Sequence, residues 1–320
     1  MWIVPEAAIA DLMTPEAAYQ AVEAVFGAMA KGDAYNFPVI REAIGHADAL
    51  YGFKSGFDRA GLNLGVKSGG YWPGNAAKGL PNHQSTVFLF DADTGRAKAV
   101  VGGNLLTALR TAAASAVSIK HLARPDAKVL GMIGAGHQSA FQMRAAARQR
   151  RFEKVIGWNL HPEMLSRLAD TAAELGLPFE AVDLDGMKAA DVVITITSSF
   201  DAILMADQVG PGTHLACMGT DTVGKQEADA ALVAGASVFT DEVAESGSLG
   251  EAQHAVKAGS LKPDDIVESG VVINGDHPGR RSDDEITLFD GTGVGLQDLA
   301  VASKVLDIAI ERGVATEVDF

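Results

Sequence analysis

The sequence predicts an α/β protein with a doubly wound parallel sheet and a second, α+β domain. Three observations predict this class. A glycine turn joins an apolar strand to a helix at 128–139, strand and helix patterns alternate after this turn, and a different pattern of strands and turns precedes it. A chain of 320 residues with 48% hydrophobic composition is long and apolar enough to bury two cores.

The first part of the chain has the pattern of an α+β domain. The Ala-rich amphipathic segment Pro15–Ala30 predicts a helix, and Gly- and Pro-rich turns separate the short strand patterns that follow it. These strands are expected at 49–53, 62–67, 86–91 and 97–101. A long helix predicted at 105–122 ends before Arg124-Pro125, so this domain is expected to cover residues 1–120.

The glycine turn has the spacing of a phosphate-binding loop. Gly134 allows the tight turn, Gly136 lets backbone N–H groups approach a pyrophosphate, and the helix that begins near Gln138 directs its positive end at the phosphates. The third position of the fingerprint is Ser139, which is small but is not glycine. Because such turns also occur without a ligand, the motif alone is a weak signal.

The context of the turn strengthens the prediction of a nucleotide site. A second strand, Lys154–Trp158, ends at polar Asn159, where a ribose-reading residue belongs, and a helix starts at Pro162. Further strand and helix patterns follow at 192–197, 214–218, 225–234 and 238–241. We therefore expect a Rossmann-type domain over 121–295, with a last helix at 296–312 that crosses back onto the first domain.

Charge and composition exclude several classes of function. A net charge of −15 disfavours nucleic acid and anionic membranes as partners. The N-terminus lacks the pattern of a signal peptide and no apolar run is long enough for a membrane helix, so we expect a cytoplasmic protein. Cys217 predicts a buried small residue rather than a nucleophile. The histidines are scattered without metal-ligand spacing, and no metal is expected.

Three polar residues are candidates for a catalytic or binding role because of their positions in the sequence. Lys67 is expected at a strand end before a flexible turn, where most lysines are simply solvated. Arg110 lies in an apolar helix and needs an anionic partner, either a ligand or a structural ion pair. Asp221 follows a strand end, where ligand groups gather in parallel sheets, although a loop aspartate can also just cap a turn.

Several segments in the same order resemble the ornithine cyclodeaminase and mu-crystallin family of NAD(P)-dependent enzymes. They are Gly65-Val66-Lys67, Pro73-Gly74-Asn75 with Gly79-Leu80-Pro81, the run 106–113 around Arg110, 134–138, Gly219-Thr220-Asp221 with Gly224-Lys225, and 293–298. The resemblance implies that residues 1–120, completed by 296–320, form a substrate-binding and dimerisation domain. It also implies a homodimer that acts on a small imino or amino acid.

The resemblance assigns roles residue by residue. Lys67 and Asp221 match the catalytic lysine and the carboxylate that exchanges a proton with the substrate nitrogen. Arg110 and Arg41 match arginines that bind the substrate carboxylate. Lys54 stands where relatives commonly have methionine, and we hypothesise that it binds a second carboxylate. The expected cofactor contacts are Asn82, Gly134, Gly136, His137, Gln138, Asn159, Thr195, Met218, Lys225, Thr292 and Gly293.

The residues after the second strand of the nucleotide domain bear on the choice of cofactor. NADP-dependent relatives place an arginine where Leu160 stands, so its absence favours NAD. Asn159 lacks the carboxylate of strict NAD sites, which leaves some NADP use open. The resemblance implies an NADH-dependent imine reductase or amino-acid dehydrogenase, with reduction of iminosuccinate to L-aspartate as the leading reaction. The alternatives are an ornithine cyclodeaminase-type lyase, a ketimine reductase or alanine dehydrogenase, and a nucleotide-dependent binding protein.

Overall fold

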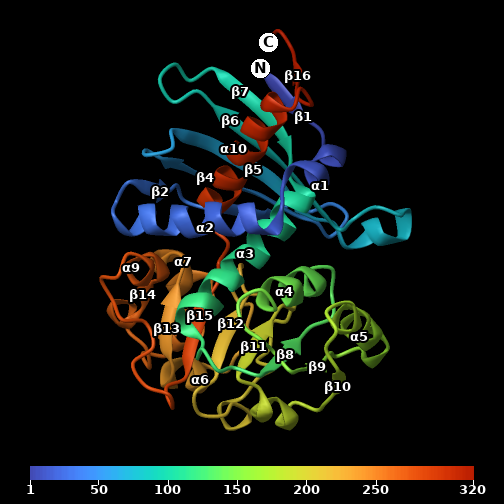
Figure 1. The fold of residues 1–320 in the computed structure, drawn as a ribbon. Helices are drawn as coiled ribbons and strands as arrows, with labels where there is room; N and C mark the ends of the chain where they lie inside the picture. Colours follow the sequence, from blue (N-terminus) through green and yellow to red (C-terminus); the bar gives the residue numbers. More distant parts are fainter. The chain divides into compact units, whose positions relative to one another are not determined.

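The computed structural model describes residues 1–320, and the chain divides into two compact units (Figure 1). Unit 1 comprises Met1–Arg110 and Val294–Phe320, and unit 2 comprises Thr111–Gly293. The chain passes from the first unit to the second inside helix α3 (Asn104–Leu122) and returns just before helix α10 (Gly295–Glu311). None of the helices combines the length and apolar character that a membrane crossing requires.

Unit 1 is built on an eight-stranded mixed sheet. Seven strands follow the order β16-β1-β7-β6-β5-β4-β2, and β3 pairs with β4. Only the β1–β7 pair is parallel. The strands are β1 (Trp2–Val4), β2 (Ala34–Asn36), β3 (Ile40–Ala43), β4 (Leu50–Asp58), β5 (Asn63–Tyr71), β6 (His83–Phe90), β7 (Ala97–Gly102) and β16 (Thr316–Glu317).

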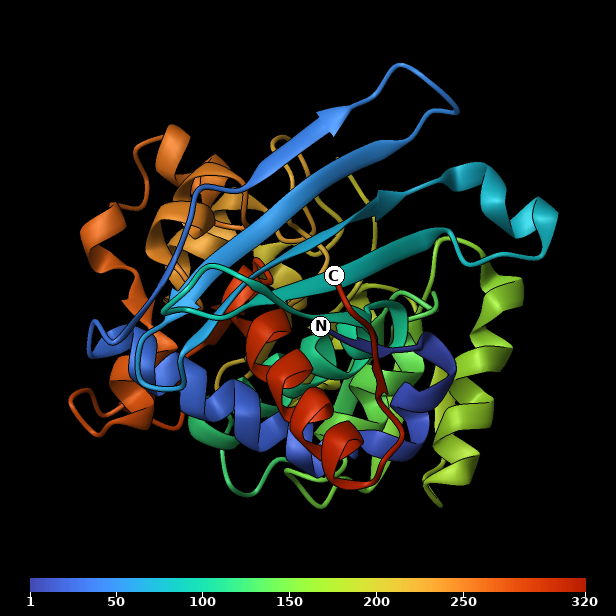
Figure 2. The same ribbon diagram turned by 90° about the horizontal axis from the view of Figure 1, so that it is seen from above.

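Helices α2 (Pro15–Ala30) and α10 pack side by side against this sheet, as Figure 2 shows. Helix α2 forms as predicted, because Thr14 caps it by accepting from the N–H of Ala17. Glycines in the central strands let α10 approach closely: a Cβ at Gly65 would lie 2.8 Å from a methyl carbon of Leu299. This contact fixes which residues α10 presents to strands β4 and β5.

Unit 2 contains a second eight-stranded sheet, and every pairing in it is parallel. Its order is β10-β9-β8-β11-β12-β15-β13-β14, so its first five strands have the doubly wound Rossmann order, and β15, the last strand of the sheet along the chain, takes the sixth place. The strands are β8 (Val129–Ile133), β9 (Lys154–Trp158), β10 (Phe179–Ala181), β11 (Val192–Thr195), β12 (His214–Cys217), β13 (Ser237–Thr240), β14 (Val267–Glu268) and β15 (Thr287–Asp290). The predicted fold class is therefore confirmed.

The helices of unit 2 are short. They are α4 (Ser139–Ala146), α5 (Leu165–Glu174), α6 (Ala230–Gly235), α7 (Val243–Ser248), α8 (Gln253–Lys257) and α9 (Ser269–Ile273). The helix expected at 225–234 begins only at Ala230, because the side chain of Asp229 caps it there. Residues 225–228 form a loop instead, and the charged side chain of Glu227 in this loop is buried.

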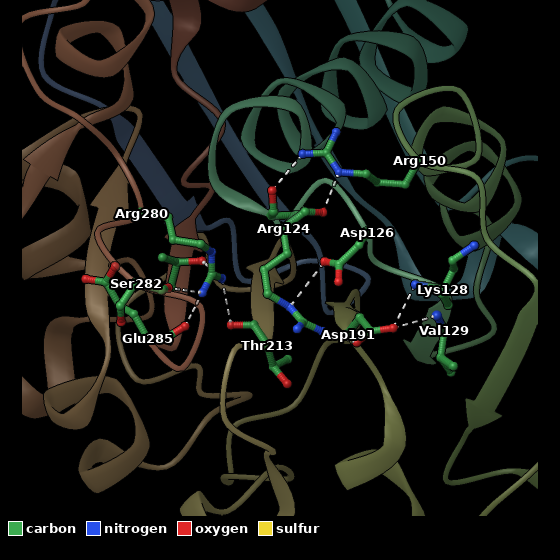
Figure 3. A network of polar contacts seen from close by, with 12 residues as sticks. Arg124, Asp126, Lys128, Val129, Arg150, Asp191, Thr213, Arg280, Ser282 and Glu285 are labelled. Carbon is green, nitrogen blue, oxygen red and sulfur yellow. Dashed lines mark hydrogen bonds and ion pairs between the residues drawn. The ribbon is translucent and has the colours of Figure 1, made fainter.

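A network of arginines secures the amino-terminal edge of the unit 2 sheet (Figure 3). Arg124 pairs with Asp191, whose other oxygen accepts from two backbone N–H groups at the start of β8. The guanidinium groups of Arg150 and Arg280 donate to backbone carbonyls at the carboxyl end of α3. A cavity of about 330 Å³ lies beside these two arginines. Because backbone carbonyl groups accept hydrogen bonds from both arginines, we assign these side chains a role in stabilising the fold of unit 2.

Candidate functional site

Two lysines lie opposite each other on neighbouring strands of unit 1. Lys54 on β4 and Lys67 on β5 are register partners, and both are buried, with 5% and 7% of their surface exposed. We expected both at strand ends, but β4 and β5 continue for four residues beyond each of them. The strand-end prediction was wrong because the glycine-rich segments after each lysine pair as strands rather than turning.

The carboxylate of Asp298 joins the predicted cations of unit 1. Its Oδ2 lies 2.7 Å from Nζ of Lys67, and its Oδ1 accepts a 3.0 Å hydrogen bond from Nε of Arg110. Arg110 also donates to Oε1 of Gln297 at 3.2 Å. Asp298 was not among the predicted site residues, although a charged residue in the apolar first turn of a helix is a usable signal.

The electrostatics of this cluster favour binding of a further anion. Burial, then the charge of Arg110, lowers the pKa of Lys67 to about 7; Asp298 opposes this shift and Lys54 adds to it. Burial alone would raise the pKa of Asp298, but Arg110 and Lys67 lower it, so this residue is a carboxylate. Because Lys54 and Arg110 both depress the pKa of Lys67, a negatively charged ligand among these cations would stabilise all three.

Two further residues contribute to the electrostatics of this cluster. Burial, together with the charges of Lys67 and Arg110, lowers the pKa of His83 to about 3 and keeps its ring neutral. Arg41 lies on β3 opposite Gly52 and is exposed, and its charge also acts on His83. The structure thus places Arg41 close enough to influence the cluster electrostatically, at its accessible edge.

Asn82, a predicted cofactor contact, lies in unit 1, where its side chain stabilises a turn through hydrogen bonds. Its Oδ1 accepts from the N–H of Ala76 at 2.8 Å, and its Nδ2 donates to the hydroxyl of Tyr71 at 3.1 Å. The side chain is half-buried. Its hydrogen bonds therefore connect the end of β5 to the segment before β6.

The glycine turn of unit 2 has the geometry that a pyrophosphate requires. Gly134 has φ +107°, and a Cβ there would lie 2.5 Å from the carbonyl oxygen of Ile196, so only glycine fits. A Cβ at Gly136 would meet nothing within 4 Å, which leaves room above the turn. Helix α4 starts without a side-chain cap, and although the N–H of Ser139 bonds to the carbonyl of Gly136, the positive end of the helix faces the turn. His137 is exposed, and Gln138 immediately precedes the helix.

The end of β9 supports the turn from the neighbouring strand. Oδ1 of Asn159 accepts from the N–H of Ala135 at 2.9 Å, and its Nδ2 donates to the carbonyl of His161. The next residue, Leu160, is 73% exposed. This edge therefore presents an amide and an apolar side chain, with no charge at Leu160 to bind a 2′-phosphate.

Asp221 lies in the loop after β12 and forms an ion pair with a second predicted residue. Its Oδ1 is 3.0 Å from Nζ of Lys225, which also donates to the carbonyl of Gly219 at 3.1 Å. The carboxylate side chain is 28% exposed and the lysine side chain 16%. Met218, at the start of the same loop, is buried. The loop thus presents a carboxylate that is partly accessible and is held by a cation.

The remaining predicted cofactor residues are tied to buried carboxylates. Thr195 is fully buried, and its hydroxyl donates to Glu227 at 2.6 Å. The N–H groups of Thr292 and Gly293 both donate to Asp241. The sequence analysis missed Glu227 and Asp241, and an acidic residue in a loop gives no signal that it points inward.

Cys217 was predicted not to act as a nucleophile, and the histidines were predicted not to bind a metal. Cys217 is a free, buried cysteine, as expected, and burial raises the pKa of its thiol well above the usual value. His214 is buried between the hydroxyls of Ser118 and Thr287. No group of three or more His, Cys, Asp or Glu side chains has an arrangement that could hold a metal ion.

The residues of unit 2 fit a dinucleotide. The uncapped helix, the glycine turn and the loops at the carboxyl ends of β8, β11 and β12 lie where parallel sheets of this strand order bind such cofactors. Gly134, Gly136 and the first turn of α4 would hold the pyrophosphate, and Asn159 lies at the ribose position.

Several known proteins are similar to this chain over nearly its whole length. The iminosuccinate reductase of Paracoccus denitrificans is 69% identical over 320 residues, which cover 100% of each chain. Its crystal structure in complex with NAD+ has a TM-score of 0.96 and covers 100% of this chain and 99% of that chain. The structure of an archaeal alanine dehydrogenase dimer with bound NAD is 30% identical, has a TM-score of 0.93 and covers 100% of this chain and 99% of that chain.

A sequence profile of one family matches residues 5–313, which is nearly the whole chain. The order of the matched motifs, the two sheets and the similarity to the Paracoccus denitrificans protein all agree with that match. The chain belongs to the ornithine cyclodeaminase/mu-crystallin family.

Proposed function

We propose that the protein is an NADH-dependent imine reductase that converts iminosuccinate to L-aspartate. The observation that carries this proposal is the buried cluster of Lys54, Lys67 and Arg110 beside the carboxylate of Asp298. The reductase of Paracoccus denitrificans, at 69% identity, bears the same substrate in its name. Iminosuccinate carries two carboxylates, and this cluster has the charge to bind a dianion.

The charges of the cluster distinguish a dicarboxylate from a monocarboxylate. Asp298 offsets one positive charge, whereas Arg110, Lys54 and Lys67 contribute three when Lys67 is protonated. Buried charges need partners, because an uncompensated one costs several kcal/mol, of the order of 3–5. A ligand with two carboxylates leaves this group of side chains close to neutral, and a ligand with one does not.

Within this scheme Arg110 and Arg41 bind the carboxylate next to the reacting carbon, and Lys54 binds the second one. The guanidinium of Arg110 is fixed by Asp298 and Gln297, which pre-orients it for a planar carboxylate. Lys67 is held by Asp298 and contacts the substrate near the imine carbon. The side chains thus bind and orient the substrate before any proton moves.

Reduction of an imine needs a hydride at carbon and a proton at nitrogen. When bound, the reduced nicotinamide supplies the hydride. Asp221 supplies or positions the proton for the nitrogen, since its partly exposed carboxylate can exchange protons with water. Nζ of Lys225, 3.0 Å from Oδ1 of Asp221, holds this side chain in place.

We further propose a cytoplasmic homodimer that prefers NAD to NADP. The exposed, uncharged Leu160 supports the cofactor preference. A dimer is supported by the related archaeal alanine dehydrogenase, whose structure is a dimer. The dependence on reduced nicotinamide, an intracellular cofactor, supports the location.

The experiment that tests this function follows NADH consumption and product together. Oxaloacetate with ammonia forms iminosuccinate in solution, and the expected result is stoichiometric NADH oxidation with formation of L-aspartate. Ornithine offered with NAD tests the lyase alternative in parallel. Formation of proline and ammonia from ornithine, without reduction of iminosuccinate, would replace the proposed function with a cyclodeaminase.

A further inference from the structure

Two buried glutamates lie beneath the loops at the carboxyl edge of the unit 2 sheet. Glu227 and Glu251 have 1% and 0% of their surface exposed. They are linked through the backbone, because the N–H groups of Glu227 and Ala228 both donate to Oε1 of Glu251, at 2.8 and 2.7 Å. Burying two carboxylates side by side is costly, so their retention in the core requires an explanation.

Glu227 binds two different loops of this edge. Its Oε1 accepts from the N–H of Thr197 at 2.6 Å, in the loop after β11. Its Oε2 accepts from the N–H of Gly219 at 2.9 Å, in the loop after β12 that carries Asp221. The hydroxyl of Thr195 donates to the same oxygen. Both oxygens therefore face backbone donors that cannot rotate, and only a carboxylate satisfies this arrangement.

Glu251 has a different environment on its second oxygen. Oε1 faces backbone donors, but Oε2 bonds to the hydroxyl of Thr220, which can either donate or accept. A proton on Oε2 of Glu251 is therefore compatible with every bond of the pair, whereas a proton on Glu227 would meet a backbone N–H. The geometry distinguishes the two glutamates.

We propose that the pair of Glu227 and Glu251 carries one proton, which resides on Glu251. Ionised Glu227 is then a positioning residue that holds the loops of Thr197 and Asp221 in the geometry needed for catalysis. Burial and the charge of Glu227 raise the pKa of Glu251 to about 8, which agrees with this assignment. The other titratable groups that act on Glu251 or lie beside it are Asp290 and Cys217.

The proposal predicts unequal effects for two chemically identical substitutions. In Glu227→Gln the new NH2 group must face the N–H of either Thr197 or Gly219, so the loops should separate. In Glu251→Gln the NH2 group can donate to the hydroxyl of Thr220, so the loops should stay in place. We expect Glu227→Gln to lower NADH affinity and kcat/KM by about 10-fold or more, and Glu251→Gln to lower them by a much smaller factor.

A control variant separates positioning from the general loss of a hydrogen-bonded, partly buried carboxylate in unit 2. Glu285 lies at the opposite edge of the same sheet (Figure 3). It bonds to Arg281 and Ser237. Glu285→Gln should lower thermal stability without changing NADH affinity. NADH affinity does not depend on which imine is reduced. Failure of this test would therefore leave the proposed substrate unaffected, and a different substrate would leave the proposed role of Glu227 unaffected.

The location of the proton is tested by infrared spectroscopy, which needs no activity and no Glu227 variant. The wild-type protein below the pKa of Glu251, about 8, should show the carbonyl stretch of a protonated carboxyl group, and Glu251→Gln should lack this component. Equal losses of NADH affinity in Glu227→Gln and Glu251→Gln, or an unchanged carbonyl stretch in Glu251→Gln, would overturn the proposal.

Discussion

Nζ of Lys67 lies 2.7 Å from Oδ2 of Asp298, a residue that follows it by more than two hundred positions and belongs to the last long helix of the chain. The same carboxylate binds Arg110 through its other oxygen. Helix α10 therefore completes the cation cluster of unit 1, and Asp298 holds two of the proposed substrate-binding residues in one fixed arrangement.

Removing the charge of Asp298 should destabilise the protein strongly. Asp298→Asn leaves the buried Arg110 without its carboxylate, and the expected loss in free energy of unfolding is about 3–5 kcal/mol in a urea titration. Asp307→Asn is a matched control, because Asp307 is exposed on the same helix. The control should change the stability by less than about 0.5 kcal/mol. Similar small effects in both variants would show that Asp298 contributes little to the cluster.

The pH dependence of catalysis should report the charge of Lys67. Lysine is cationic below its pKa, and that of Lys67 is about 7, so kcat/KM for iminosuccinate should fall as the pH rises through this value. Lys67→Arg retains the positive charge over this range and should lack that decline, even if its rate is lower. A wild-type profile that is flat through neutral pH would contradict a role for the charge of Lys67.

The choice of cofactor should depend on Leu160. Because this exposed side chain offers no charge to a 2′-phosphate, kcat/KM should be higher with NADH than with NADPH. Leu160→Arg should narrow the difference between the cofactors by improving NADPH use, measured with both cofactors at a fixed imine concentration. Equal or better use of NADPH by the wild-type enzyme would show that another residue reads the ribose.

The loop after β12 should control the proton that reaches the substrate nitrogen. Asp221→Asn is expected to lower kcat by about 10²–10⁴-fold while NADH binding stays nearly intact. Lys225→Met removes the cation 3.0 Å from Asp221, so the Asp221 side chain should lose the contact that holds it and kcat should fall, by less than in Asp221→Asn. Full activity of Asp221→Asn would show that Asp221 only stabilises the turn and takes no part in proton transfer.

Much of the fold was predictable because local patterns and tertiary structure agree there. Strands β8 and β9 have the predicted bounds, since continuous apolar runs between glycine turns suit a sheet buried on both faces. Strand β15 was missed, because it has only four residues and follows the acidic run Asp283-Asp284-Glu285, a pattern typical of a solvated turn. In the structure Glu285 of that run is bound by the nearby Arg281 and by Ser237, and the contact with Ser237, 48 positions away, is one that no local pattern predicts.

The candidate site was predictable only where a residue type was unusual for its surroundings. Arg110 in an apolar helix required an anion, and the structure supplies Asp298 as that partner. The register of Lys54 opposite Lys67 could not be predicted, because it depends on how long two glycine-containing strands remain paired. The same holds for Glu227, whose role follows from the loops that surround it.

The most direct test of the account is the ratio of kcat/KM for iminosuccinate to kcat/KM for the imine of pyruvate, measured in the wild type, Lys54→Met and Lys78→Met. Lys78 is exposed and serves as the matched control. We predict that the wild type strongly prefers iminosuccinate, that Lys54→Met lowers the ratio by about 10- to 200-fold, and that Lys78→Met leaves it unchanged. A wild-type enzyme that reduces the imine of pyruvate as efficiently as iminosuccinate would contradict a site built for two carboxylates.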